Sequence, residues 1–312
     1  MPEKKKIKGM FDSISNDYDR LNHIMSLDVD RLWRKRAISR IVDTDMPLEV
    51  LDVASGTGDF AIAIAKAMRG RIADDTSDRA LSLDVADTSN RVKPLDAADT
   101  SDRVKPLNAA DTNDRVKPLN AADTSDRVLS FRADEVGVGI CDKRMGHITA
   151  VDISEGMLSV MRQKVASEAL NNVISVEVGD GENLRFPDGT FDRVAIAFGI
   201  RNFENKEKGL REMLRVLKPG GKLVLLELSL PENKWLRRIF NLYFLNILPI
   251  IGGSVSGDSA AYKYLPASVL GFPKKKEFIA LMKSCGFSNV RHKSFTFGVC
   301  RMFIGEHPVS KG

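Results

Sequence analysis

Short apolar runs alternate with longer segments of helical spacing along most of this chain of 312 residues. The runs have the length of strands, and between them apolar residues recur every three or four positions, as at Met157, Met161 and Val165. The expected strands span residues 48–53, 148–152, 174–178, 191–198, 222–228, 289–293 and 299–304. The expected helices span residues 59–67, 156–169, 206–216 and 278–285. This alternation predicts an α/β fold with a doubly wound, mostly parallel sheet, helices on both faces and a closing pair of C-terminal strands.

Two further segments have patterns of their own. Residues 10–42 carry helical spacing and no strand, so residues 1–45 are expected to form a helical lid on a single domain of residues 1–312. The stretch 235–251 is very apolar, but it holds Arg237, Arg238 and Pro249 and is shorter than the ~20 residues of a membrane span. We expect a helix that is either buried or interfacial, the second giving a peripheral contact at the inner face of a membrane.

A tandem repeat interrupts the pattern between residues 71 and 145. A unit of 12 residues recurs five times, starting at Asp75, Asp87, Asp99, Asp111 and Asp123. Each copy offers few apolar side chains, which cannot offset an ordering cost of ~1–2 kcal/mol per residue. We therefore expect a disordered surface insertion that leaves the flanking domain intact, with a β-solenoid or a partner-docking arm as the alternative.

Composition and charge narrow the class of protein only mildly. Hydrophobic residues make up 43% and charged residues 29% of the chain, as in ordinary globular proteins. The net charge of +5 suits an anionic lipid or a phosphate-bearing ligand, but it is too small to indicate nucleic acid. Cys141, Cys285 and Cys300 have no C-x-x-C spacing, so we expect reduced thiols in a cytoplasmic protein and no metal site. The basic N-terminus lacks the apolar run of a signal peptide.

The most informative stretch is VLDVASGTGD, residues 50–59, where a strand ends in an acid and a turn leads into a helix. Gly56 and Gly58 allow a ligand to approach the backbone closely, and the stretch formally satisfies the dinucleotide pattern G-x-G-x-x-[G/A]. Asp52 and Asp59, however, place negative charge where a diphosphate would lie. A cationic ligand such as S-adenosylmethionine fits better, while a tight turn without any ligand stays an alternative.

Acidic residues also end the next two expected strands. Asp152 follows the second strand, where a carboxylate can accept both ribose hydroxyls, although it could instead be a helix N-cap. Asp180 and Gly181 follow the third, where an acid can accept from an adenine amino group, although the pair is also a common turn. Because the carboxyl ends of parallel strands share one edge, these residues should line one crevice.

These motifs, with LKPGG at residues 217–221, resemble the class I S-adenosylmethionine-dependent methyltransferases. More narrowly, the chain resembles the ubiquinone/menaquinone biosynthesis C-methyltransferases. The motifs that carry this narrower resemblance are FDSI at 11–14, YD at 18–19, Asn22, MS at 25–26, RLW at 31–33, FGIRN at 198–202 and DSAAYKYL at 258–265. The resemblance covers essentially the whole chain outside residues 71–145. It implies a Rossmann-like fold with an antiparallel C-terminal strand.

The resemblance also implies an activity, which is methyl transfer from S-adenosylmethionine to a ring carbon of a polyprenylated quinol, such as demethylmenaquinol or a ubiquinone precursor. The cofactor residues would be Asp52, Gly56, Thr57, Gly58, Asp152, Asp180 and Gly181. Some relatives have Ser where this chain has Ala197, so a hydroxyl contact is lost there. A homodimer stays open. The alternatives are a methyltransferase for another lipid or phenol, an NAD(P)-dependent oxidoreductase, and a binding protein that works through its repeats.

Catalysis is expected at Arg201 and Asn202, which follow the fourth strand at the same edge. An arginine is protonated at any working pH and cannot be the base. Our hypothesis is that Arg201 lowers the pKa of the quinol hydroxyl and orients a water or carboxylate that takes the proton, with an ordinary ion pair as the alternative. Tyr262 and Tyr264 are expected to line the quinone pocket, although tyrosines in a helix are more often packing residues.

Overall fold

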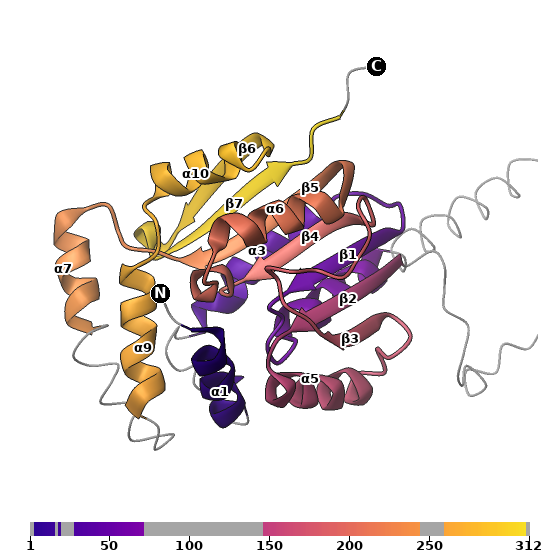
Figure 1. Ribbon diagram of the computed structural model, residues 1–312, viewed down its shortest axis with the longest axis horizontal. Coiled ribbons are helices and arrows are strands. Elements are labelled where there is room, and N and C mark those ends of the chain that lie inside the picture. Colours follow the sequence, from indigo (N-terminus) through magenta and orange to yellow (C-terminus); the bar gives the residue numbers. More distant parts are fainter. Residues whose placement is uncertain (1–2, 16–17, 20–27, 72–145, 244–258, 310–312) are drawn as a thin grey trace, which may run out of the picture. The chain divides into compact units, whose positions relative to one another are not determined.

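The computed structural model describes residues 3–15, 18–19, 28–71, 146–243 and 259–309, which form one sheet with helices packed against it (Figure 1). The strands are β1 (Leu48–Val53), β2 (Gly146–Asp152), β3 (Ile174–Val178), β4 (Phe191–Ala197), β5 (Leu217–Leu228), β6 (Ser288–Phe295) and β7 (Cys300–Glu306). The helices are α1 (Lys4–Ile14), α3 (Val29–Ile41), a helix over residues 59–71, α5 (Glu155–Ser167), α6 (Lys206–Val216), α7 (Lys234–Leu242), α9 (Ser259–Leu270) and α10 (Lys275–Ser284). Short 3-10 turns are η1 (Ile200–Asn202) and η3 (Thr296–Gly298).

The strand order of the sheet is β3-β2-β1-β4-β5-β7-β6. Strands β1 to β5 pair in parallel, and β7 lies antiparallel between β5 and β6. The chain proceeds from β1 to β2 on one side, and β4 pairs with β1 on the other, so the order reverses at β1. A crevice forms at such a reversal, outside the carboxyl ends of the strands. The prediction of a mostly parallel sheet with an antiparallel C-terminal strand is confirmed.

Strand β5 begins earlier than the sequence suggested. We expected residues 218–221 to close helix α6 and the strand to begin at Lys222, but Leu217 already pairs with Phe191. The ladder then resumes at Lys222 opposite Arg193, so the residues between form a bulge. Gly220 takes a φ of +79° there, which costs little without a side chain. The prediction was wrong here because a Pro-Gly-Gly sequence favours a turn, and a bulge accommodates the same residues within a strand.

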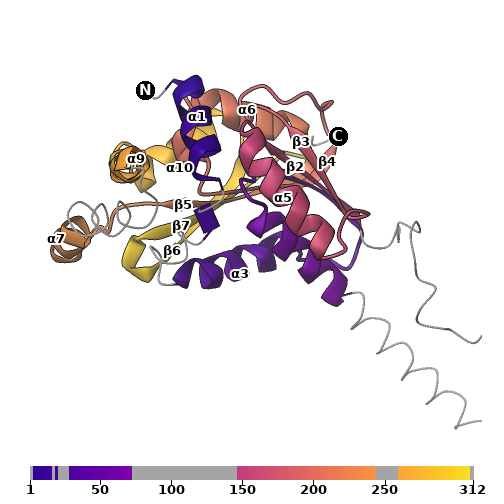
Figure 2. The same cartoon turned by 90° about the horizontal axis from the view of Figure 1, so that it is seen from below.

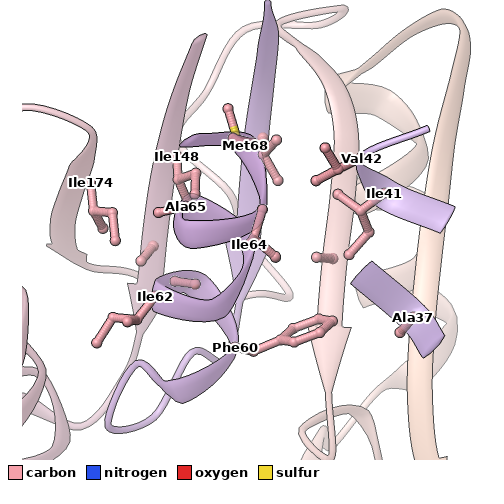
Figure 3. Packing of buried hydrophobic residues seen from close by; sticks show 14 of the residues in the cluster. Ala37, Ile41, Val42, Phe60, Ile62, Ile64, Ala65, Met68, Ile148 and Ile174 are labelled. Carbon is pink, nitrogen blue, oxygen red and sulfur yellow. The ribbon is translucent and has the colours of Figure 1, made fainter. Parts of the chain in front are cut away.

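Both faces of the sheet are covered by apolar side chains of helices. One cluster joins α3, the helix over residues 59–71 and α5 to the sheet, and a second joins α6 and α10 to its other face. In Figure 2, α3 lies on one side of the sheet and α6 on the other. Figure 3 shows the first cluster, with Ile64, Ala65 and Met68 packed close to Ile148. Burying each large side chain contributes about 1.5–3 kcal/mol, so this packing fixes the strand ends in place.

The N-terminal and apolar segments are partly described. Helices α1 and α3 lie within the expected lid region, and α7 lies within the apolar stretch at 235–251. None of the described helices is both long and apolar enough to cross a bilayer. The repeats at 75–134, on which we predicted a disordered insertion, and the second half of the apolar stretch lie outside the described residues.

Candidate functional site

A cavity opens at the carboxyl ends of β1, β2, β3 and β4, under helix α1. It encloses about 900 Å³ of empty space, part of it open to solvent. Of the residues predicted from the sequence, it is lined by Gly56, Thr57, Asp152, Asp180, Gly181 and Asn202. The topology therefore brings together residues from four strand ends, as the sequence suggested. Asp52, Gly58, Arg201 and Tyr264 are not among its lining residues.

The turn after β1 is held by two glycines that do different things. Gly56 has a φ of +57° and presents its backbone to the cavity. Gly58 has a φ of +87°, and a Cβ on it would lie 2.5 Å from Cγ of Met161. Because Gly58 has no side chain, α5 can pack directly against the turn. A glycine in this motif is expected to allow such a close contact between helix and strand. Thr57 is buried, and its hydroxyl donates to the Asp19 carboxylate.

Asp52 is buried behind this turn. Its side chain is withdrawn from water at 1% exposure, and neither carboxylate oxygen has a hydrogen-bond partner of good geometry. Burial is the main reason that the pKa of Asp52 rises to about 7, and the nearby charge of Asp152 adds to the rise. The Ser55 hydroxyl, the Arg34 charge and the Ala61 N–H act in the opposite direction. Asp52 does not line the cavity, so in this arrangement it would not contact a ligand there directly.

Asp152 ties two loops of the cavity together. One carboxylate oxygen accepts the N–H of Gly56 at 2.9 Å, and the other accepts the N–H of Ser154 at 2.9 Å. Burial raises the pKa of Asp152 above its ordinary value, although these backbone donors act against the rise. The N-cap of α5 is Ser154, whose hydroxyl accepts the N–H of Met157, so the N-cap alternative for Asp152 is wrong.

Asp180 faces the N-terminal helix across the cavity. Its Oδ2 lies 2.7 Å from Nζ of Lys4, and its Oδ1 accepts the N–H of Glu182 at 2.9 Å. Lys4 also lies 3.3 Å from Glu182. Burial lowers the pKa of Lys4, but the two carboxylates outweigh it and raise the pKa above its ordinary value. The ion pairs hold the beginning of α1 over the end of β3.

Gly181, next to Asp180, allows two side chains to approach its backbone closely. A Cβ on Gly181 would lie 2.5 Å from Cζ of Phe203 and 2.7 Å from Cγ1 of Val53. Phe203 itself lines the cavity. A larger residue at position 181 would therefore move the wall of the cavity.

Asp59 does not present an uncompensated charge to the cavity. Its carboxylate lies 2.8 Å from Nη1 of Arg34 and 2.8 Å from Nζ of Lys164. Burial raises the pKa of Asp59, but the bonds and charges of these cations prevail and lower the pKa below its ordinary value. Our argument that Asp59 would repel a diphosphate is correspondingly weaker, because its charge is neutralised from α3 and α5.

Arg201 and Asn202 lie side by side in η1 but face different surroundings. Arg201 is buried, with Nη1 2.8 Å from Oε1 of Glu227 and its backbone N–H bonded to Oε2 at 3.0 Å. Nη1 also donates to the carbonyl of Phe198. Burial lowers the pKa of Arg201, but the charge of Glu227 prevails and raises it. The arginine is thus in an ion pair, as our alternative suggested, but inside the protein.

Asn202 is the residue of this turn that lines the cavity. Its Oδ1 accepts the hydroxyl of Tyr264, from α9, at 3.0 Å. Burial raises the pKa of Tyr264, with Glu227 adding to the rise and Arg201 opposing it, so the phenol remains a donor at neutral pH. Tyr262 lies in α9 as well, but its side chain is outside the described part of the chain.

Several residues of the site were missed by our sequence reasoning. Three of them form ion pairs that compensate the charge of a residue we had singled out, namely Lys4, Arg34 and Glu227. Each lies far from its partner in sequence and on another element. A fourth, Asp12, accepts the Ser154 hydroxyl at 2.6 Å and the N–H of Gly156 at 3.1 Å, and so links α1 to α5. The only signal for Asp12 was its place in the family motif at residues 11–14.

Comparisons with known proteins agree with this geometry. The model of the ubiE/COQ5 methyltransferase family matches residues 1–103 and 120–307. Among relatives, the ubiquinone/menaquinone biosynthesis C-methyltransferase UbiE of Geobacter sulfurreducens is 36% identical over 97% of this chain and 88% of its own length. The demethylmenaquinone methyltransferases of Deinococcus radiodurans and Bacteroides fragilis are 34% and 31% identical, each over 96% of this chain and 92% of its own.

Solved structures share the fold at much lower identity. The [4+2]-cyclase SpnF superposes with a TM-score of 0.56 at 14% identity, covering 99% of this chain and 98% of its own. A SAM-dependent methyltransferase of Thermotoga maritima superposes with a TM-score of 0.50 at 15% identity, covering 96% of this chain and 99% of its own. These likenesses show the fold alone.

Proposed function

We propose that this chain, which belongs to the ubiE/COQ5 methyltransferase family, methylates a ring carbon of demethylmenaquinol. The chain is an S-adenosylmethionine-dependent methyltransferase of quinone biosynthesis. Menaquinone is favoured because the relatives from Deinococcus and Bacteroides are named for demethylmenaquinone alone. A ubiquinone precursor is the other candidate, since the name of the Geobacter relative covers both quinones.

The cavity has the polar groups that this methyl donor requires. We assign Asp152 to the ribose hydroxyls, because each of its oxygens accepts one backbone N–H and a carboxylate offers about four acceptor positions. Asp180 has the same capacity beside its bond to Lys4, which suits an adenine amino group. The lining holds four carboxylates, on Asp59, Asp152, Asp180 and Glu182, against the two cations Lys4 and Arg34, and this negative balance favours a ligand with a positive charge. The apolar Ile153 and Met157 supply surfaces for the purine ring.

The chemistry requires a nucleophilic ring carbon and an acceptor for its proton. S-adenosylmethionine would supply an electrophilic methyl group. The ring carbon bonds to this methyl as its bond to the sulfonium sulfur breaks, S-adenosylhomocysteine leaves as a neutral thioether, and the ring proton passes to a water or a carboxylate. We assign Asn202 to the quinol oxygen, because Tyr264 engages its Oδ1 and so directs the amide NH₂ elsewhere. Hydrogen bonds to a developing phenolate would lower the pKa of the quinol.

Arg201 then acts as a positioning residue and not through direct contact. Its charge is taken up by Glu227, and it does not line the cavity. Its backbone and side chain anchor η1, which fixes where Asn202 points. This assignment revises our hypothesis that the guanidinium charge itself acts on the quinol.

The polyprenyl tail of the substrate requires contact with a membrane. Helix α7 carries Trp235, which is 71% exposed, and Leu242, which is also exposed. An amphipathic helix with an exposed aromatic side chain suits the surface of a bilayer. We therefore propose a peripheral contact through α7, which predicts that Trp235→Ala lowers co-sedimentation with liposomes of neutral lipid.

A direct assay tests the proposed reaction. The purified full chain is incubated with methyl-labelled S-adenosylmethionine and, in separate samples, demethylmenaquinol and a ubiquinone precursor, both dispersed in detergent. The expected product is labelled menaquinol, identified by its mass, with little product from the other quinol. Product from the ubiquinone precursor alone would transfer the assignment to ubiquinone, and no labelled quinone from either would refute the proposal.

A further inference from the structure

A second cavity lies away from the strand-end site. It encloses about 960 Å³ of empty space, part of it open to solvent. Its walls come from the segment after β5, from α7, from the link between α9 and α10, and from β7. None of its lining residues belongs to the cavity at the carboxyl ends of β1 to β4. It is therefore a separate place at which a ligand could bind.

The charged residues of this cavity are mainly basic. The basic ones are Arg237, Lys274, Lys275, Lys276 and Arg301, and the acidic ones are Glu232 and Glu277. Glu277 is engaged locally, since its carboxylate accepts the N–H of Lys274 at the start of α10 at 3.0 Å. The amino terminus of α10 also opens here, and its positive dipole end adds to the potential. The cavity thus favours an anion.

Arg301 is the observation that indicates a ligand. Its side chain is only 4% exposed, and its Nε donates to no acceptor. Its Nη2 lies 3.1 Å from Oε1 of Glu232 and 3.4 Å from the carbonyl of Leu230. A buried guanidinium N–H without an acceptor is unfavourable, so an anion that reaches this guanidinium would be favourable.

Glu232 shows how an anionic oxygen is held in this cavity. Its side chain is 61% exposed, yet one carboxylate oxygen lies 2.8 Å from Nζ of Lys275 and 3.1 Å from Nη2 of Arg301. Two cations from different elements, α10 and β7, therefore converge on one oxygen. An exposed surface carboxylate in such a position can be displaced by a ligand with stronger acceptor oxygens, and a phosphate group has several.

We propose that this cavity binds a phosphate group, through Arg301, Lys275 and the amino terminus of α10, and that Glu232 competes with it. Two sources have this chemistry, namely the headgroup of an anionic phospholipid and a free phosphate ester. Arg237, which lines the cavity, belongs to α7, the helix that also exposes Trp235. A phosphate held here would therefore lie close to the surface at which α7 contacts a bilayer.

The test compares two probes on the full chain. One is glycerol phosphate in solution, followed by titration calorimetry. The other is vesicles of phosphatidylglycerol in phosphatidylcholine, with vesicles of phosphatidylcholine alone as the reference. Arg301→Gln should weaken binding about tenfold or more, because it removes charge-assisted hydrogen bonds. Glu232→Gln should tighten binding about threefold or more, because it removes the competing carboxylate.

Matched variants separate a built site from diffuse charge. Lys275→Gln and Lys283→Gln make the same change of charge on one helix, but only Lys275 lines the cavity. Glu168→Gln, whose carboxylate pairs with Lys66, is the counterpart of Glu232→Gln outside the cavity. The proposal requires that Lys275→Gln weakens and Glu232→Gln tightens binding while both control variants leave it unchanged. Lys275 and Glu232 are half-exposed or exposed, so their variants are expected to fold. The test therefore remains decisive if Arg301→Gln fails to fold.

Each result decides the proposal. Binding of glycerol phosphate with the expected variant pattern supports a site for free phosphate esters, and binding of the anionic vesicles alone with that pattern supports a lipid headgroup. The proposal is overturned if all the charge variants change binding to the same extent, or if neither probe binds. Methyl transfer in detergent is measured on the same variants and should be unchanged, so that failure here is distinguishable from failure of the proposed reaction.

Discussion

Arg201 and Glu227 form an ion pair that is almost completely withdrawn from water. Nη1 lies 2.8 Å from Oε1, and the side chains are 6% and 0% exposed. Removing one partner from such a pair leaves an uncompensated buried charge, which costs about 3–5 kcal/mol. Glu227 also accepts the backbone N–H groups of Arg201 and Leu228, so the pair fixes both η1 and the end of β5.

The first prediction concerns this pair. Glu227→Gln should lower the free energy of unfolding by about 3–5 kcal/mol, measured by urea denaturation. Arg211→Gln is the control, because its pair with Glu207 is exposed to solvent, and it should change the free energy of unfolding far less. Equal effects of the two variants would show that the buried pair has no special role.

Arg201→Lys tests the positioning role separately. Lysine keeps the charge but cannot reproduce the planar guanidinium that bonds Glu227 and the Phe198 carbonyl. We expect kcat to fall about tenfold or more while the affinity for S-adenosylmethionine changes little. If Arg201 acted only through the stability of the protein, conditions that restore the folded population would restore kcat. Such a recovery of kcat would show that Arg201 has no positioning role.

The second prediction concerns Asp152. Asp152→Asn keeps the shape of the side chain but removes its charge and replaces one acceptor by a donor, which opposes the Gly56 or the Ser154 N–H. The dissociation constant for S-adenosylmethionine, measured by calorimetry, should rise about tenfold or more. Asp188→Asn, at a carboxylate that is largely exposed, should bind normally. Unchanged affinity in Asp152→Asn would mean that this residue only holds the two loops together and does not bind the cofactor.

The third prediction concerns Gly181. In Gly181→Ala the new Cβ meets Phe203 at 2.5 Å and Val53 at 2.7 Å, so the cavity wall must shift. We expect weaker binding of S-adenosylmethionine together with a lower Tm. The control is Gly70→Ala, because a Cβ on Gly70 meets nothing within 4 Å, and it should leave binding unchanged. A tightly binding, stable Gly181→Ala variant would mean that Phe203 moves without consequence.

The fourth prediction follows from the protonation of Asp52. Its pKa rises from 3.8 to about 7 on folding, so the folded protein binds a proton that the unfolded chain releases. The contribution to stability is therefore present at low pH and is lost as pH rises from about 4 to about 7, by an amount on the order of 4 kcal/mol. In Asp52→Asn this loss should be absent. The measurement is urea denaturation of both proteins at several pH values, and parallel curves would refute the assignment.

Much of the fold follows from local pattern, because each strand and its terminal acid lie within a short stretch of sequence. The ends of β1, β2 and β3 could be placed at Val53, Asp152 and Val178, and the crevice followed from parallel pairing. Helix α9 was not delimited, since Pro266 lies inside it and proline argues against a helix.

The compensating charges could not be predicted. Lys4 and Asp180 are 176 positions apart, and Arg201 and Glu227 are 26 apart on different elements. No local pattern indicates which cation reaches which acid, because the answer depends on how α1 and β5 pack. For the same reason Asp59 was treated as a free charge, and Arg201 as a group that acts directly on substrate.

The account depends most on the strand-end cavity binding a sulfonium donor. The most direct measurement is titration calorimetry of the purified full chain with S-adenosylmethionine and, under the same conditions, with NAD. We predict saturable binding of S-adenosylmethionine that Asp152→Asn weakens, and no measurable heat with NAD. Saturable binding of NAD without any binding of S-adenosylmethionine would contradict the account.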